Sequence, residues 1–94
     1  MIIVSGKIFV RPGKRQEFLA LSSEAIVKAR KTAGCLDFTV SADLVEPDRV
    51  NVYEAWEAED ALLRFRGQGP SKEILSLIVG AEVARHLVAS SGAA

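Results

Sequence analysis

Two stretches, CLDFTVSADL at residues 35–44 and RVNVYEAWE at residues 49–57, decide the fold of this chain. In each stretch apolar and polar side chains alternate, which is the pattern of a strand with one buried face. Between them, Glu46-Pro47-Asp48 has the composition of a turn. Because the connection is short, the two strands are expected to form an antiparallel hairpin.

A strand and a helix are predicted before this hairpin. Residues 2–10 are rich in Ile and Val, which favours a strand. Pro12-Gly13 then interrupts the chain. Residues 14–32 carry apolar side chains at spacings of three and four, as in an amphipathic helix. Gly34 suits the left-handed conformation that often follows the end of a helix.

After the hairpin we expect a second helix and a last strand. The helix starts near Glu59 and Asp60, is broken at Gly67-Gln68-Gly69-Pro70, and ends at Gly80. Residues 82–89 alternate again and predict a strand. The order β-α-β-β-α-β predicts an α+β, ferredoxin-like domain, in which helices cover one face of a four-stranded antiparallel sheet.

Composition limits the class of protein. The 94 residues suit a single domain, residues 1–94, with a frayed tail at 90–94. Lys+Arg and Asp+Glu both number 12, so the chain lacks the basic field typical of nucleic-acid or anionic-membrane binding. The N-terminus does not resemble a signal peptide, and no apolar run approaches the roughly 18 residues of a membrane span. We therefore expect a cytoplasmic protein that binds neither nucleic acid nor membrane.

The second sheet face predicts a partner. A monomer with this topology exposes one face of its sheet, and that face should then be polar. Neither the first nor the last strand has a clean polar face. In the first strand Ile3 and Phe9 oppose Ile2, Val4 and Ile8, and in the last strand Leu87 opposes Val88. With 49% hydrophobic residues in so small a chain, the excess apolar surface predicts a homodimer in which two sheets pack face to face.

The motifs resemble a known family. Gly34-Cys35-Leu36-Asp37-Phe38 and the run from Val52 to Leu62 (VYEAWEAEDAL) are similar to the antibiotic biosynthesis monooxygenase family. That family has a Gly-Cys second strand, Tyr-Glu-x-Trp on the third strand, and an acidic helix start that ends in Ala-Leu. Pro12-Gly13-Lys14 and the chain length also fit. The resemblance implies a dimeric α+β barrel built from two ferredoxin-like sheets.

The resemblance also implies a range of functions. Some members oxidise phenolic or anthrone-type aromatics with O2 and without metal or flavin, others act on quinols, small signalling molecules or haem, and several have no known activity. Our first hypothesis is a cofactor-independent monooxygenase that oxidises a small apolar aromatic or quinol, with no cofactor and no metal. The alternative is a non-catalytic, dimeric small-molecule-binding or accessory domain. An RNA-binding module would need a basic, aromatic strand surface, which the sequence lacks.

Two positions depart from the active members of the family. An Asn lies four residues before the Trp in those members, whereas this chain has Val52. Many members carry a histidine on the following helix, where this chain has Phe65. Haem-degrading members need that histidine as the iron ligand, so haem degradation is not expected here.

The candidate catalytic residues are Trp56, Tyr53 and His86. Trp56 carries over from the family as a residue near the cavity between helices and sheet. Tyr53 could hydrogen-bond a substrate oxygen, or could simply find a partner in the core or interface. His86, the one histidine, could act as a general base, or could lie on the surface of an edge strand.

The candidate substrate-binding residues are Phe38, Phe65 and Asn51. Phe38 and Phe65, with Trp56, could form stacking walls or could be plain core. Asn51 shares a strand face with Tyr53, but the sequence does not decide whether that face meets the helices or a partner.

Three further features accompany these residues. Glu54 is either a buried carboxylate with a raised pKa or half of an ion pair, and the ion pair, with Arg85, is favoured. The break at 67–70 is a hypothetical gate at the cavity mouth. Cys35 has no basic neighbour and is expected to be a small buried hydrophobe, while one His and one Cys cannot form a zinc site.

Overall fold

The computed structural model describes residues 1–67 and 69–94 of the chain. Its strands and helices follow the predicted order, with the second helix in two pieces: β1 (Ile2–Val10), α1 (Arg15–Arg30), β2 (Cys35–Ala42), β3 (Arg49–Trp56), α2 (Glu59–Arg66), α3 (Lys72–Leu77) and β4 (Ile78–Leu87). Residues 89–94 are exposed and belong to no helix or strand. Among the described residues, no helix is long and apolar enough to cross a membrane.

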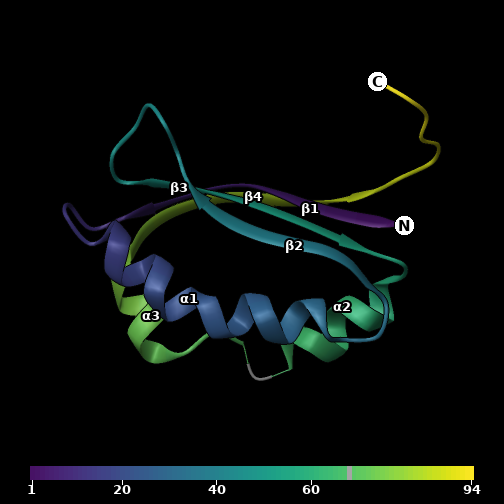
Figure 1. The fold of residues 1–94 in the computed structure, drawn as a ribbon, viewed down its shortest axis with the longest axis horizontal. Coiled ribbons are helices and arrows are strands. Elements are labelled where there is room, and N and C mark those ends of the chain that lie inside the picture. Colours follow the sequence, from purple (N-terminus) through teal and green to yellow (C-terminus); the bar gives the residue numbers. More distant parts are fainter. Residues whose placement is uncertain (68) are drawn as a thin grey trace.

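The strands form one antiparallel sheet in the order β2-β3-β1-β4. Figure 1 shows the three helices together on one side of this sheet, and the other side without a cover. This is the α+β, ferredoxin-like arrangement, and the predicted fold is confirmed.

The register fixes which side chains face the helices. Val4 of β1 lies opposite Glu54 of β3, and Phe38 of β2 lies opposite Glu54 on its other side. Because opposed residues of an antiparallel pair share a face, every second residue of β3 points toward the helices. These are Val50, Val52, Glu54 and Trp56, all buried.

Two apolar clusters hold the helices against the sheet. The larger cluster gathers around Trp56 and Leu62, which are fully buried, and includes residues of β1, β2, α1 and α2. The smaller cluster packs Phe18 of α1 against Val50 and Leu77 at the other end of the sheet. Helix α1 is thus anchored at both ends, which leaves its middle turns free to border a cavity.

The boundary between the last helix and the last strand differs from the prediction. The apolar spacing of Ile74, Leu75, Ile78 and Val79 predicted a helix that runs to Gly80, but α3 ends at Leu77 and β4 begins at Ile78. Ile78 pairs with Val10 of β1, and the ladder continues through Gly80. Ile78 and Val79 are both β-branched, which favours the strand, and pairing with Val10 satisfies backbone groups of Ile78, while Val79 lies at a bulge.

The uncovered face of the sheet is less apolar than the sequence suggested. It carries both kinds of side chain: Ile3, Phe9, Tyr53, Ala55 and Ala84 beside Lys7, Asp37, Thr39, Ser41, Asn51, Glu82 and His86. The expectation of a mostly apolar second face was therefore too strong. Leu87, by contrast, pairs with Ile2 and lies on the helix side, where it is exposed because the helices do not cover β4.

A polar network closes the hairpin between β2 and β3. The amide of Asn51 donates to Asp43 at 2.9 Å, and the guanidinium of Arg49 donates to the Asn51 side-chain oxygen at 2.8 Å. Arg15 of α1 donates to the carbonyl oxygens of Asp43 and Glu46, both at 3.0 Å. Backbone N–H groups and the Asn51 amide lower the pKa of Asp43 to about 2. Asn51 thus stabilises the hairpin on the uncovered face.

Gly34 is one position where the backbone needs glycine. It has the left-handed conformation expected after α1, with φ of 90°. A Cβ built there would lie 2.5 Å from the Cβ of Ala61 on α2. Gly34 therefore lets α2 approach the turn before β2, which brings Phe65 over the sheet.

We expect Gly34→Ala to lower the melting temperature more than Gly13→Ala does. Both glycines have positive φ, 90° and 76°, so both substitutions carry the cost of about 1–2 kcal/mol of a left-handed alanine. No atom lies within 4 Å of a Cβ at Gly13, so only Gly34→Ala also displaces α2. Calorimetry of the two variants measures the difference, and equal losses would contradict a close packing of α2 on Gly34.

Candidate functional site

A cavity of about 330 Å³ lies between the inner face of the sheet and the helices. Its floor comes from β1, β2 and β3, and its walls come from α1, α2 and the segments around α3. The described lining residues are Ile8, Phe18, Ser22, Ala25, Lys28, Phe38, Val40, Val52, Glu54, Phe65, Arg66, Gly69, Pro70, Ile74 and Ile78. Apolar side chains make up most of this set, which suits a small apolar ligand.

Three aromatic rings meet at one end of the cavity. The ring of Phe65 on α2 lies 5.4 Å from the ring of Trp56, at a tilt of 34°, and 5.4 Å from the ring of Phe38, edge to face. Trp56 is fully buried and does not line the cavity. Phe38 and Phe65, which line the cavity, therefore present an aromatic wall that Trp56 supports from behind. The structure thus brings together three of the six predicted site residues.

Glu54 places a carboxylate in this apolar setting. Its side chain lies on the helix side of β3, only 7% of the residue is exposed, and it lines the cavity. The indole N–H of Trp56 donates to its Oε1 at 3.0 Å. The predicted ion pair with Arg85 is wrong, because Arg85 instead donates to Glu59 at 2.9 Å.

The environment of Glu54 favours its neutral form. Burial raises the pKa of Glu54, while the hydrogen bond from Trp56 and the charge of Arg66 oppose that rise. The free energy lost when a carboxylate is removed from water exceeds the free energy gained from one hydrogen bond and one distant cation. The chain thus keeps a proton-binding group of raised pKa beside an aromatic wall.

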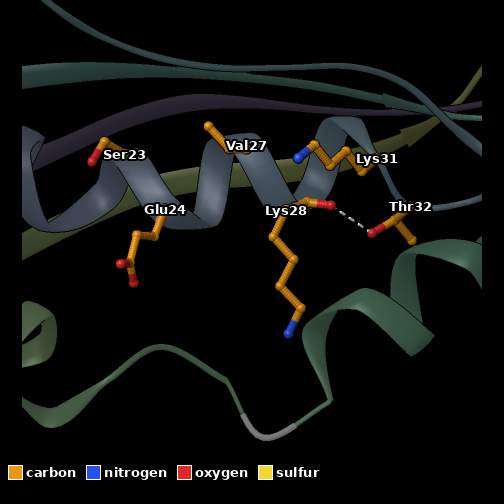
Figure 2. Close-up of a pocket in the computed structure, with 6 residues that line it drawn as sticks. All are labelled: Ser23, Glu24, Val27, Lys28, Lys31 and Thr32. Atoms are coloured by element: carbon orange, nitrogen blue, oxygen red, sulfur yellow. Dashed lines mark hydrogen bonds between the residues drawn. The ribbon is translucent and has the colours of Figure 1, made fainter.

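Lys28 is the one residue labelled in Figure 2 that also lines the inner cavity. Lys28 extends from α1 toward α2 and the segment before α3. It lines the cavity together with Arg66, Gly69 and Pro70, all of them exposed. The cavity therefore opens between α1 and the break in the second helix, which is where the sequence predicted a gate. Gln68, within that predicted gate, lies outside the described residues.

Lys28 also borders a shallow depression on the outer side of α1. This depression is lined by Ser23, Glu24, Val27, Lys28, Lys31 and Thr32 (Figure 2). The hydroxyls of Ser23 and Thr32 donate to the carbonyl oxygens of Ala20 and Lys28, both at 2.8 Å. Exposed, flexible side chains form it, so it has no fixed walls to position a ligand. The inner cavity is therefore the candidate site.

The other three predicted site residues lie on the uncovered face. Tyr53 pairs with Ser5 and Thr39, and His86 pairs with Ile3, which places both side chains away from the helices. Asn51 is on the same face, within the hairpin network. The sheet thus separates Tyr53, His86 and Asn51 from the cavity of their own chain, and their roles in catalysis and binding stay predictions.

Cys35 is half-buried and packs against the larger apolar cluster. Burial and the charges of Asp37 and Glu54 raise the pKa of its thiol, which disfavours the reactive thiolate. Within residues 1–67 and 69–94, no three His, Cys, Asp or Glu side chains come together in a way that could hold a metal ion.

Comparison with known proteins supports the resemblance noted in the sequence. The model of the family described as "Antibiotic biosynthesis monooxygenase" matches residues 1–75. The chain belongs to the antibiotic biosynthesis monooxygenase family. The matched residues include β1 to β3, α2 and the start of α3, and so include nearly all of the cavity.

The individual relatives of this chain share only part of its sequence. An uncharacterized protein of Synechocystis (sll1783) is 36% identical over 61 residues, which are 65% of this chain and 42% of that protein. The chain thus spans about two fifths of the curated relative that it matches. A conserved protein of Methanosarcina mazei is 26% identical, with a TM-score of 0.78 over 90% of this chain and 89% of that one.

A proposed antibiotic biosynthesis monooxygenase of Deinococcus radiodurans superposes with a TM-score of 0.82 over 100% of this chain and 98% of that one. Its identity of 17% means that this likeness concerns the fold alone. The fold and the family are thus established, and the chemistry must come from the residues of the cavity.

Sequence reasoning noticed Glu54 but did not place it in the site. Its neighbour in the strand alternation, Trp56, was a candidate, and the two share a face. The missing information was that this face meets the helices rather than a partner. A single carboxylate among Val50, Val52 and Trp56 on a buried face was the available signal.

We expect Glu54→Gln to stabilise the protein at neutral pH and not at acid pH. A raised pKa means that the fold holds the Glu54 proton more tightly than the unfolded chain does. The stability from that proton is present below the ordinary Glu pKa of about 4.3 and is lost as the pH rises through the raised pKa. Glutamine stays neutral and can still accept the Trp56 N–H.

Thermal unfolding between pH 4 and pH 8 measures this effect. The gap in melting temperature between Glu54→Gln and wild type should widen with pH, by about 4–8 °C per kcal/mol in a domain of this size. Glu57→Gln is the matched control, since Glu57 is exposed. A gap that is the same at both pH values would contradict a raised pKa.

Proposed function

We propose that the chain is a cofactor-independent monooxygenase that oxidises a small aromatic or quinol-type substrate with O2 in the inner cavity. The observation that carries this proposal is the aromatic wall of Phe38 and Phe65, with Trp56 behind it, in a cavity of about 330 Å³. Membership of the monooxygenase family supports the class of reaction.

The reaction needs a substrate that can reach O2 as an electron-rich anion. When the CH2 group of an anthrone becomes a carbonyl, one oxygen atom of O2 enters the product. The other oxygen atom leaves as water with the two hydrogens. The protein has to bind the aromatic rings, exclude water and stabilise the anion. Stacking on Phe38 and Phe65 would supply the binding, and the helices over the sheet would exclude water.

The alternative is a binding domain without turnover. Val52 and Phe65 both line the cavity, at the two positions where the family resemblance would have placed an Asn and a His. They make the cavity more apolar than that of the active members, which favours ligand binding over proton chemistry. The two functions differ in one measurable property, the consumption of O2.

We expect Ala25→Phe to abolish oxygen uptake by filling the cavity. Ala25 lines the cavity from the middle of α1, so a phenyl ring there takes the place of the substrate ring. Val27→Phe is the control, because Val27 lies on the same helix, is 53% exposed and does not line the cavity. An oxygen electrode with a panel of anthrones and quinols should show at least a tenfold loss in kcat/KM for Ala25→Phe alone.

Two results would count against this function. Uptake at the background rate for every compound, with binding intact, would leave the binding domain as the better description. Equal uptake by Ala25→Phe and wild type would place the reaction outside the cavity.

We further propose that two chains pair through the uncovered faces of their sheets. Ile3, Phe9 and Tyr53 lie on that face, and the loop between β2 and β3 rises on the same side, away from the helices (Figure 1). Leu44 and Val45 in this loop are 100% and 88% exposed. A partner sheet would cover these apolar side chains and would bring Tyr53 and His86 into the interface.

Ser5→Arg should convert the dimer into a monomer. Ser5 lies at the centre of the uncovered face, between Tyr53 and Ala84, where two-fold pairing would bring two buried arginines together. Ser23→Arg introduces the same side chain on the exposed side of α1 and should leave the dimer intact. Size exclusion with light scattering at micromolar concentration tests this, and a monomeric wild type would contradict the pairing.

A further inference from the structure

Within residues 1–67 and 69–94, one oxygen atom at the floor of the cavity has no hydrogen-bond partner. Glu54 supplies the single carboxylate among the described lining residues. Its Oε1 accepts the indole N–H of Trp56, but within the described part of the chain its Oε2 accepts no hydrogen bond. The described residues contain no fully buried side-chain oxygen that lacks a partner, so Oε2 is open to the cavity.

The other polar side chains among the described lining residues do not offer a free hydrogen-bond acceptor at the floor of the cavity. The Ser22 hydroxyl donates to the Phe18 carbonyl oxygen at 2.8 Å within α1. Lys28 and Arg66 lie at the exposed mouth and carry only donors. Among the side chains of the described lining residues, Oε2 of Glu54 is therefore the acceptor available beside the aromatic wall, where a substrate ring would stack.

Resting on the proposed function, we propose that Glu54 is the catalytic base of the cavity, accepting the acidic proton of the aromatic substrate at Oε2. The proton leaves the O–H group of a phenol or the acidic C–H group of an anthrone, and the electron pair of that bond stays on the substrate as the anion. O2 then oxidises this anion, and the proton on Glu54 leaves in the product water.

The surroundings suit such a base. Only 7% of the Glu54 residue is exposed, so the charge of its carboxylate is poorly solvated and a proton donor is a favourable partner. The charged and titratable groups that face it are Arg66 of α2 and Lys28 of α1 at the mouth, and Cys35 of β2, whose thiol pKa the carboxylate helps to raise. Trp56 holds Oε1 in place, which fixes the direction of Oε2.

Trp56 also makes the test of this role specific. In Glu54→Gln, the indole N–H still requires an oxygen acceptor, so the amide oxygen occupies the Oε1 position. The amide NH2 group then occupies the Oε2 position and faces the cavity. The substitution thus replaces an acceptor by a donor at one atom while the shape of the cavity is kept.

The first experiment measures binding with naphthol and its methyl ether as probes. Both have the same rings, but only naphthol has a proton to donate. Trp56 is the only tryptophan of the chain, and its ring lies against Phe65. Its fluorescence should therefore change when a probe binds against Phe65 in the cavity. Wild type should bind naphthol about tenfold more tightly than the ether, as one hydrogen bond to a charged group predicts. Glu54→Gln should lose this preference, and Glu57→Gln should keep it.

The second experiment measures oxygen uptake with an anthrone across the pH range. Wild type should lose kcat/KM on the acid side, at a pH above the ordinary Glu range, because the protonated carboxyl cannot accept a proton. Glu54→Gln should lose about a hundredfold or more in kcat/KM and lack that acid limb. Glu57→Gln should match wild type at every pH.

The two experiments test separately whether Glu54 is the catalytic base and whether the protein is a monooxygenase. Oxygen uptake by Glu54→Gln within threefold of wild type, with the acid limb unchanged, would overturn the base and leave the monooxygenase standing. A naphthol preference that survives in Glu54→Gln would also overturn it. A preference that is lost as expected, in a protein that takes up no oxygen, would support Glu54 as the proton acceptor and contradict the monooxygenase.

Discussion

The alternation of side chains along β3 is the constraint on which the rest of the structure depends. β3 is a central strand, paired with β2 on one side and β1 on the other, so its two faces define the two faces of the sheet. Val50, Val52 and Trp56 are buried on one of them, which is where the helices must pack. The same alternation forces Glu54 inward and Tyr53 outward. A shift of one residue in register would exchange the two sets.

Burial of Glu54 has a cost that packing alone does not explain. An apolar residue at this buried position would pack against the helices without the desolvation of a carboxylate. Groups that lower stability at a cavity wall are typical of functional sites, where a proton has to be bound or released. The Trp56 hydrogen bond offsets part of the cost and gives the carboxylate one orientation.

Particular residues show what the sequence could and could not predict about the site. Trp56, Phe38 and Phe65 come from three elements, yet all three were candidates, because large aromatic side chains beside apolar faces signal a core or a cavity. His86 and Tyr53 were chosen for their chemistry, and the register places them on the uncovered face. Glu54 was seen but paired with Arg85, whose actual partner is Glu59 on α2.

The sequence by itself determined the order of the elements, the faces of each strand and the family. Alternation, apolar spacing and turn residues act over a few positions, so they can be read locally, as can the left-handed Gly34. Only the tertiary structure decided which face of the sheet the helices cover, since that depends on the summed packing of two clusters far apart in sequence. Because the helices cover the face that carries Glu54, this residue is a buried carboxylate whose Oε2 is open to the cavity, and not one half of the expected ion pair.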